Sequence, residues 1–141
     1  MSRVMSLDLG KVRIGIALSD IMGIIASGYQ TFERTQDEQK DMLSLASLAK
    51  EKDCATIVIG LPLNMDGSIG ASAKASYEFG EKLQAYTNAK IAYWDERLTT
   101  ASAERSLLAA DVRREKRKKI IDKVAATIIL QSYLDKLGNK I

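Results

Sequence analysis

The sequence contains no histidine among its 141 residues. This absence excludes a Ser-His-Asp triad, a Cys-His pair and any zinc site built from imidazole ligands. If the protein is an enzyme, its acid–base and metal chemistry must come from carboxylates, lysines, tyrosines and water. There is also only one cysteine, Cys54, so no disulfide can form within the chain. The apolar segment around it, DCATIVIG, predicts a buried thiol and not a nucleophile or a metal ligand.

Long apolar runs are missing as well. No run reaches the roughly 18 residues that a membrane-spanning helix needs, and the first ten residues, MSRVMSLDLG, lack the layout of a signal peptide. The composition, 46% hydrophobic and 28% charged, is that of an ordinary soluble protein. We therefore expect a cytoplasmic protein without membrane contacts, folded as one domain over residues 1–141.

The pattern of apolar residues predicts an α/β protein. Short alternating or wholly apolar runs predict strands at 3–10, 13–20, 23–33, 55–60 and 90–94. Longer amphipathic segments predict helices at 36–52, 71–87, 100–110 and 119–137. This order of elements favours a mixed sheet in which three antiparallel N-terminal strands join parallel ones.

Acidic residues stand at three places where these elements would bring them together. Asp8 lies within the first strand, on its less apolar face, where a carboxylate is costly unless something positive meets it. Asp95 and Glu96 follow the apolar run KIAYW, and functional groups gather outside the carboxyl ends of parallel strands. Asp122 is expected to open the last helix, on a face with two alanines that would let the helix approach Asp8.

Each carboxylate has a plainer interpretation when it is taken singly. Asp8 could bond the turn amides near Gly10, Asp95 and Glu96 could be solvated, and Asp122 could simply favour the first turn of a helix. Together, however, the three positions fit a cluster that binds magnesium or manganese. Hard divalent cations take carboxylate oxygens, and two ions about 4 Å apart can hold both oxygens of a phosphodiester displacement.

The segment DLGKVRIGIA adds two further features. Gly10 and Gly15 are placed around a tight turn, where the backbone can approach a ligand. Arg13 would orient a carboxylate or contact a phosphate. The pattern D-x-G also opens the sugar kinase and actin-like ATPase fold, but that fold needs two such domains and this chain is too short for them.

Four segments together resemble the signature blocks of the RuvX family, also called YqgF. They are SLDLGKVRIGIALSD, VIGLPLNMDGS, DERLTTASAE and IDKVAATIILQSYLD, and they cover nearly the whole chain. The resemblance implies an RNase H-like fold, with a five-stranded mixed sheet and helices on both faces, and a divalent-metal nuclease. Matched position by position, it implies that Asp8 in D-x-G, Glu96 in D-E-R and Asp122 in D-x-x-A-A are the catalytic, metal-binding acids.

The resemblance also suggests residues that hold a substrate. Family members keep the loop GLPLNMDGS near the active site, so Asn64 would donate to phosphate or sugar oxygens, although a purely connecting turn is an equally good interpretation. Arg97 would balance the local negative charge or reach a phosphate. Asp95 would support the site or cap the next helix, and Thr99 or Thr100 would start that helix.

The net charge of +3 is concentrated in one segment. Residues 111–119, DVRREKRKK, hold six basic and two acidic residues, immediately before Asp122. Such a run on a solvated helix usually only favours solubility, but its position here favours a clamp for nucleic-acid phosphates made by Arg117, Lys118 and Lys119. Aromatic residues make up only 6% of the chain and none lies within this run, so sequence-specific binding of single strands is expected to be weak.

Three functions remain open from the sequence. The first is a magnesium-dependent nuclease that acts on structured RNA, in maturation of the 5′ end of precursor 16S ribosomal RNA, with which the family is associated. The second is the same chemistry on branched DNA, as a Holliday junction resolvase, and the third is a non-catalytic RNA-binding factor for ribosome assembly. We expect nucleic acid and precursor ribosomal particles as partners, and a monomer or a weak homodimer.

Overall fold

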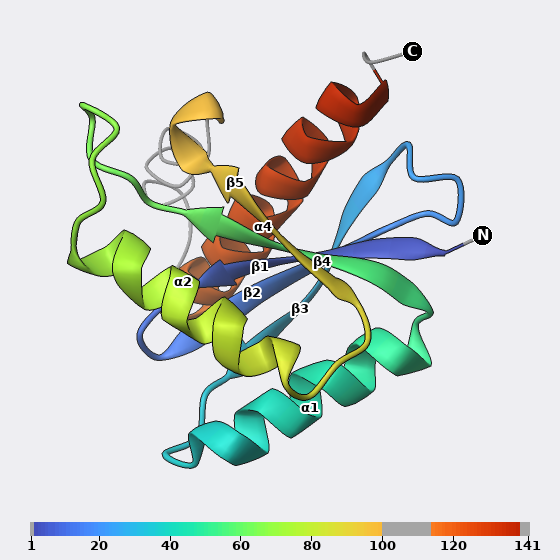
Figure 1. The fold of residues 1–141 in the computed structure, drawn as a ribbon, viewed down its shortest axis with the longest axis horizontal. Coiled ribbons are helices and arrows are strands. Elements are labelled where there is room, and N and C mark those ends of the chain that lie inside the picture. Colours follow the sequence, from blue (N-terminus) through green and yellow to red (C-terminus); the bar gives the residue numbers. More distant parts are fainter. Residues whose placement is uncertain (1, 100–113, 139–141) are drawn as a thin grey trace.

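The computed structural model describes residues 2–99 and 114–138, with only the backbone described for residues 114–120. In this part of the chain five strands form a sheet: β1 (Arg3–Leu9), β2 (Arg13–Ser19), β3 (Ala26–Glu33), β4 (Cys54–Leu61) and β5 (Lys90–Asp95). Their order is β3-β2-β1-β4-β5 (Figure 1). β1, β2 and β3 pair antiparallel, whereas β4 pairs in parallel with both β1 and β5. The predicted mixed sheet is confirmed.

Helices cover both faces of this sheet (Figure 1). They are α1 (Glu38–Glu51), α2 (Ala71–Gln84) and α4 (Arg114–Gly138), and a short 3-10 helix, η1 (Glu96–Leu98), follows β5. α1 and α2 pack against one face, and α4 packs against the other. The helix predicted for residues 100–110 lies outside the described residues.

Alternation within β1 sends its side chains to opposite faces, as predicted. Met5 and Leu7 are fully buried in the core under α1 and α2. Ser6 points to the other face, where its hydroxyl donates a hydrogen bond to the carbonyl oxygen of Ala126 at 2.7 Å. Because side chains alternate along a strand, Asp8 shares the α4 face with Ser6.

The predicted buried positions of α1 and β4 are also confirmed. The apolar stripe of α1 is buried along its whole length and consists of Met42, Leu45, Ala46 and Ala49. Cys54, at the start of β4, is 9% exposed, and burial raises the pKa of its thiol to about 11. A thiol with this pKa stays protonated at neutral pH, which suits a core side chain and not a nucleophile.

α4 begins at Arg114 and not near residue 119 as predicted. The segment REKRKK lacks an apolar period, but Arg, Lys and Glu are all good helix formers. Asp122 therefore lies in the third turn of α4, and its predicted place at the helix start is wrong. Since the helix dipole favours acidic groups only within the first turn, it no longer explains this carboxylate. Neither α4, at 25 residues, nor another helix in the described ranges is apolar enough to cross a bilayer.

The connection between β2 and β3 is longer than the sequence suggests. The apolar run GIIASGYQTFE predicts a strand from residue 23, but β3 begins at Ala26. The carboxylate of Asp20 accepts hydrogen bonds from the backbone N–H groups of Ile24 and Ile25, at 2.8 and 3.0 Å, and holds these residues in a loop. Both isoleucines are more than half exposed, so their side chains do not take part in the sheet packing that the prediction assumed.

Replacing Asp41 with alanine is expected to lower the free energy of unfolding by about 1–2 kcal/mol. Asp41 is 2% exposed, and its carboxylate accepts hydrogen bonds from the backbone N–H and the hydroxyl of Thr35, at 3.1 and 2.8 Å. These bonds fix the connection from β3 to α1. Urea unfolding should show a lower midpoint with an unchanged m-value. A wild-type midpoint would mean that water replaces the carboxylate without cost.

Candidate active site

Asp8 lies near the carboxyl end of β1, in the middle of the sheet. It is 6% exposed and faces Gly15 of β2 in the antiparallel ladder. On the other side, Leu7 pairs with Ile59 of β4, so Gly60 is the next residue along β4 beside Asp8. Asp8 is thus flanked by a glycine on each neighbouring strand, and no neighbouring side chain covers it within the sheet.

Gly15 brings Asp122 to this place. A Cβ atom at Gly15 would overlap the carbonyl group of Asp122, so only glycine allows α4 to approach β2 this closely. The next turn of α4 continues the contact with two small residues, Ala125 and Ala126, which are 1% and 0% exposed. The prediction that small residues let the last helix approach the sheet is confirmed.

Gly60 performs the same role for Glu96. A Cβ atom at Gly60 would lie 3.0 Å from Oε2 of Glu96 and 2.8 Å from Cδ1 of Ile129 in α4. The carboxylate of Glu96 therefore turns back from η1 over the end of β4, on the face that α4 covers. It shares this face and this edge of the sheet with Asp8.

The three predicted acids consequently occupy neighbouring positions around the end of β1. Asp8 belongs to the sheet, Asp122 lies over the glycine on one side of it, and Glu96 lies over the glycine on the other. Among the described residues, no group of three Asp, Glu, Cys or His side chains is arranged closely enough to hold a metal ion. The backbone thus places the acids as neighbours, and their roles in metal binding and catalysis remain predictions.

Asp95 caps η1 and holds Arg97. Its carboxylate accepts a hydrogen bond from the backbone N–H of Arg97 at 2.9 Å and pairs with the guanidinium at 2.7 Å. The side-chain hydrogen bond from Arg97 keeps the pKa of Asp95 below its usual value. Arg97 also donates to the carbonyl oxygen of Met65 at 3.3 Å, which ties the end of β5 to the loop between β4 and α2. Thr99 closes η1, since its hydroxyl donates to the carbonyl oxygen of Glu96.

The loop that contains Asn64 is organised by its own polar side chains. The amide of Asn64 donates to the hydroxyl of Ser68 at 2.9 Å, and this hydroxyl donates to the carboxylate of Asp66 at 2.6 Å. Gly67 adopts a φ of 87°, which favours glycine, and completes the turn. These contacts show a role in loop shape. Contact of Asn64 with a substrate remains a prediction.

Arg13 starts β2 and lies two residues before Gly15, on the same face of the strand. Its Nε is buried and has no hydrogen-bond partner in the described part of the chain. A buried donor without an acceptor is costly, so an oxygen of a bound ligand would be favourable here. The side chains of Arg117, Lys118 and Lys119 lie outside the described residues, although the helix that carries them is present.

Two site-forming features were missed or misread in the sequence. Gly15 was expected at a turn near a ligand, but it lies inside β2 and contacts α4. Gly60 is the last residue of the strand predicted at 55–60, and its role in providing space for Glu96 was not predicted. A glycine inside a strand often marks a close approach by another part of the chain, and this signal was available in both cases.

The chain also matches a known protein family. The family model RuvX, described as Holliday junction resolvase, matches residues 2–136. The chain belongs to the RuvX family. A protein from Halalkalibacterium halodurans is 53% identical over 135 residues, covering 95% of this chain and 96% of the relative. A protein from Clostridium botulinum (strain Alaska E43) is 50% identical over 136 residues, covering 96% and 98%. Both relatives carry the name "Putative pre-16S rRNA nuclease".

Solved structures support the same fold. RuvC of Thermus thermophilus, in a complex with a Holliday junction substrate, aligns with a TM-score of 0.61 over 98% of this chain and 97% of its own. RuvC from the same organism in another structure aligns with a TM-score of 0.55 over 96% of each chain. Sequence identity is 8% in both cases, so the likeness concerns the fold. The expected family and fold are confirmed.

Proposed function

We propose that this RuvX-family protein is a metal-dependent nuclease that hydrolyses phosphodiester bonds near the 5′ end of precursor 16S ribosomal RNA, in the cytoplasm. The observation that carries the proposal is the approach of Asp122 and Glu96 to Gly15 and Gly60, the glycines on either side of Asp8. The names of the relatives support the choice of RNA.

The residues present fit a divalent cation. The three acids offer only carboxylate oxygens, the ligands that Mg²⁺ and Mn²⁺ prefer, and glycines 15 and 60 leave room for Asp122 and Glu96 beside Asp8. A bound ion would activate water and stabilise the charge that develops on the phosphate. Asp8 is held by the central strand of the sheet, so its position needs little rearrangement when substrate binds.

Arg13 and α4 complete the site. The buried Nε of Arg13 has no partner among the described residues, and an oxygen of the phosphate would provide one if substrate binding exposes it. The basic residues Arg117, Lys118 and Lys119 lie about one turn before Asp122 on α4. In this arrangement α4 brings a phosphate clamp and a catalytic acid to the substrate on one rigid element.

Incubation of the purified protein with precursor 16S RNA and with a four-way DNA junction tests the proposal directly. We expect the RNA to be cleaved with magnesium or manganese, more slowly with calcium, and not in EDTA. Cleavage that is undiminished in EDTA would contradict metal dependence. Cleavage of the junction alone would favour a resolvase, and binding of RNA without cleavage under any metal would favour an assembly factor.

Replacing Arg117, Lys118 and Lys119 with alanine is expected to flatten the salt dependence of RNA binding. Each lost phosphate contact reduces the slope of log affinity against log salt by roughly 0.7–0.9, so the triple variant should lose about 2 units. The measurement is a titration in a salt series, in an Asp122→Asn background that does not cleave. Lys50, Lys90 and Lys136 are exposed elsewhere, and their replacement removes the same charge as a control. Equal slopes in both triple variants would show that the segment makes no specific phosphate contacts.

A further inference from the structure

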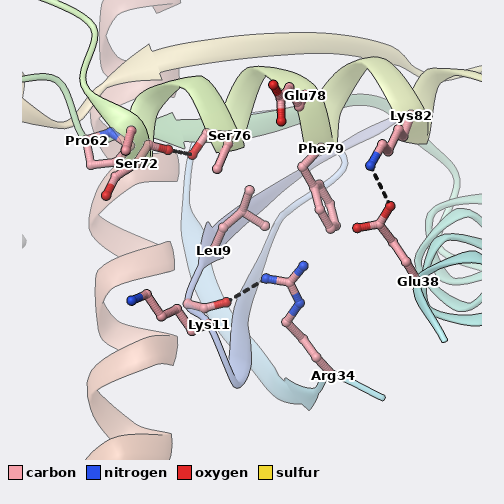
Figure 2. A pocket seen from close by; sticks show the side chains of 13 residues that line it. Leu9, Lys11, Arg34, Glu38, Pro62, Ser72, Ser76, Glu78, Phe79 and Lys82 are labelled. Carbon is pink, nitrogen blue, oxygen red and sulfur yellow. Dashed lines mark hydrogen bonds and ion pairs between the residues drawn. The ribbon is translucent and has the colours of Figure 1, made fainter. Parts of the chain in front are cut away.

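A hollow of about 390 Å³ lies on the face of the sheet opposite Asp8 but at the same edge (Figure 2). It is enclosed by the end of β1, the connection from β3 to α1, and the outer side of α2. Leu9 and Gly10, the two residues that follow Asp8, form its border toward the acids. The volume falls within the roughly 300–1,000 Å³ of small-molecule sites in proteins.

The inner wall of the hollow is apolar and contains a fixed guanidinium group. Leu9 and Phe79 line it, and Phe79 is only 5% exposed. Arg34 extends into the hollow, where its Nη1 donates to the carbonyl oxygen of Gly10 at 2.8 Å and its Cζ lies 5.4 Å from the centre of the Phe79 ring. An arginine held in this way offers a flat, weakly hydrated surface on which a planar group can stack.

The rim is polar and carries more positive than negative charge. Its charged side chains are Lys11, Arg34, Glu38, Glu78 and Lys82. Lys82 and Glu38 form an ion pair at 2.8 Å that closes the end of the hollow away from β1. Lys11, at the turn between β1 and β2, is exposed at the opposite end, beside Leu9 and three positions after Asp8 in the sequence. Hydroxyl groups of Ser72 and Ser76 complete the lining.

Gly10 lies at the border between the hollow and the strand that carries Asp8. Gly10 tightens the β1–β2 turn, because its N–H donates to the carbonyl oxygen of Arg13 at 2.8 Å and a Cβ atom there would lie 2.6 Å from that oxygen. At Gly10 the turn carries no side chain, so within the described residues this is where a strand of nucleic acid would pass most easily between Asp8 and the hollow.

We infer that the hollow receives one unpaired nucleobase of the RNA strand that is cut, with Lys11 next to its phosphate. This inference rests on the proposed nuclease function and narrows its substrate. RNA-binding proteins commonly stack unpaired bases on aromatic rings or arginine planes, and the side chains of Ser72 and Glu78 offer partners for base edges. The substrate would then have a single-stranded nucleotide beside the cleaved bond, which a fully paired four-way junction lacks.

The test compares two RNA duplexes that carry the same short single-stranded extension. One extension has normal bases, and the other has abasic sugars, so the phosphates are matched. Binding is measured to the full-length Asp8→Asn protein at one salt concentration. Stacking of one base predicts about tenfold tighter binding of the extension with bases, near the lower end of measured stacking effects.

Filling the hollow should remove this difference. Ala75 and Ser72 are exposed on α2 and line the hollow, so Ala75→Leu and Ser72→Leu occupy it without entering the core. In both variants we expect the tenfold difference to fall to nearly one, with unchanged binding of the abasic RNA. The control is Ala85→Leu, the same alanine-to-leucine change at the residue that caps the far end of α2, away from the hollow. This variant should retain the tenfold difference in binding. Thermal unfolding by circular dichroism checks that each variant is folded.

The outcomes separate this inference from the proposed function. A ratio near one in the parent protein, or a tenfold ratio that persists in both filled variants, would overturn the base-binding site. Cleavage of precursor RNA by the intact protein with magnesium would then still support the nuclease. The base-binding site would be supported if the parent protein and Ala85→Leu show the tenfold ratio and both filled variants lose it. This result would stand even if the intact protein left precursor RNA uncut, which would contradict the nuclease proposal.

Discussion

Replacing Asp8 with asparagine is expected to reduce cleavage of precursor RNA by about a thousandfold or more. Asparagine keeps the shape of the side chain but removes the charge on the residue that stands between Gly15 and Gly60. A divalent ion supplies several kcal/mol of transition-state stabilisation, and each 1.36 kcal/mol changes a rate about tenfold. Single-turnover cleavage with saturating magnesium measures the loss, and filter binding should show that the RNA is still bound.

A second buried aspartate provides the matched control for this variant. Asp41 is also almost fully buried, but it lies on α1, and its carboxylate accepts hydrogen bonds from Thr35 in the connection to β3. Asp41→Asn should lower thermal stability while the folded protein keeps its cleavage rate. If Asp8→Asn cleaved RNA at a rate close to wild type, Asp8 would be a structural residue and the three-acid site would be incorrect.

Replacing Gly15 with alanine is expected to lower the free energy of unfolding by about 3 kcal/mol, near the upper end for overpacking. The added methyl group would overlap backbone atoms of Asp122, and a backbone cannot rotate away as a side chain can. Relief requires movement of α4 away from β2, which also displaces Asp122 from Asp8. A displacement of about 1 Å can cost roughly a hundredfold in rate, so cleavage should fall even below the unfolding temperature.

Gly138 offers the control for this substitution. It lies at the end of α4, where an added Cβ atom would meet no atom within 4 Å. Gly138→Ala should leave stability and cleavage unchanged, or raise stability slightly, because alanine favours a helix. Urea unfolding of the two variants measures the difference. Equal unfolding midpoints for Gly15→Ala and wild type would show that α4 can move away from β2 without loss of stability.

The parts of the fold that the sequence predicted are those with a strong local pattern. The alternation in β1 assigned Met5 and Leu7 to one face and Asp8 to the other, and both assignments are observed. The uniformly apolar β4 was correctly placed among parallel strands. The position of Glu96 followed from the general rule that functional groups collect at the carboxyl ends of such strands.

Features that depend on contacts between distant segments were not predictable in this way. The start of α4 was misplaced because its charged first turns have no apolar period. The isoleucines of the β2–β3 loop were read as strand because their hydrogen bonds to Asp20 do not appear in a hydrophobic pattern. The hollow beside Leu9 is lined by residues from β1, the β3–α1 connection and α2, so the pattern of no single segment predicts it.

The packing of α4 has a consequence for the protein during its own synthesis. The first strands leave the ribosome early, but the helix that covers one face of them, through Ala126 and Leu130, is made after all five strands of the described sheet. Until α4 is made, Ala17 and the other residues that α4 covers stay exposed to solvent. We expect chaperones to bind this exposed face, or nascent chains to associate transiently through it. Asp122 arrives with the same helix. A nascent chain in which α4 has not yet been made therefore lacks the third of the predicted acids.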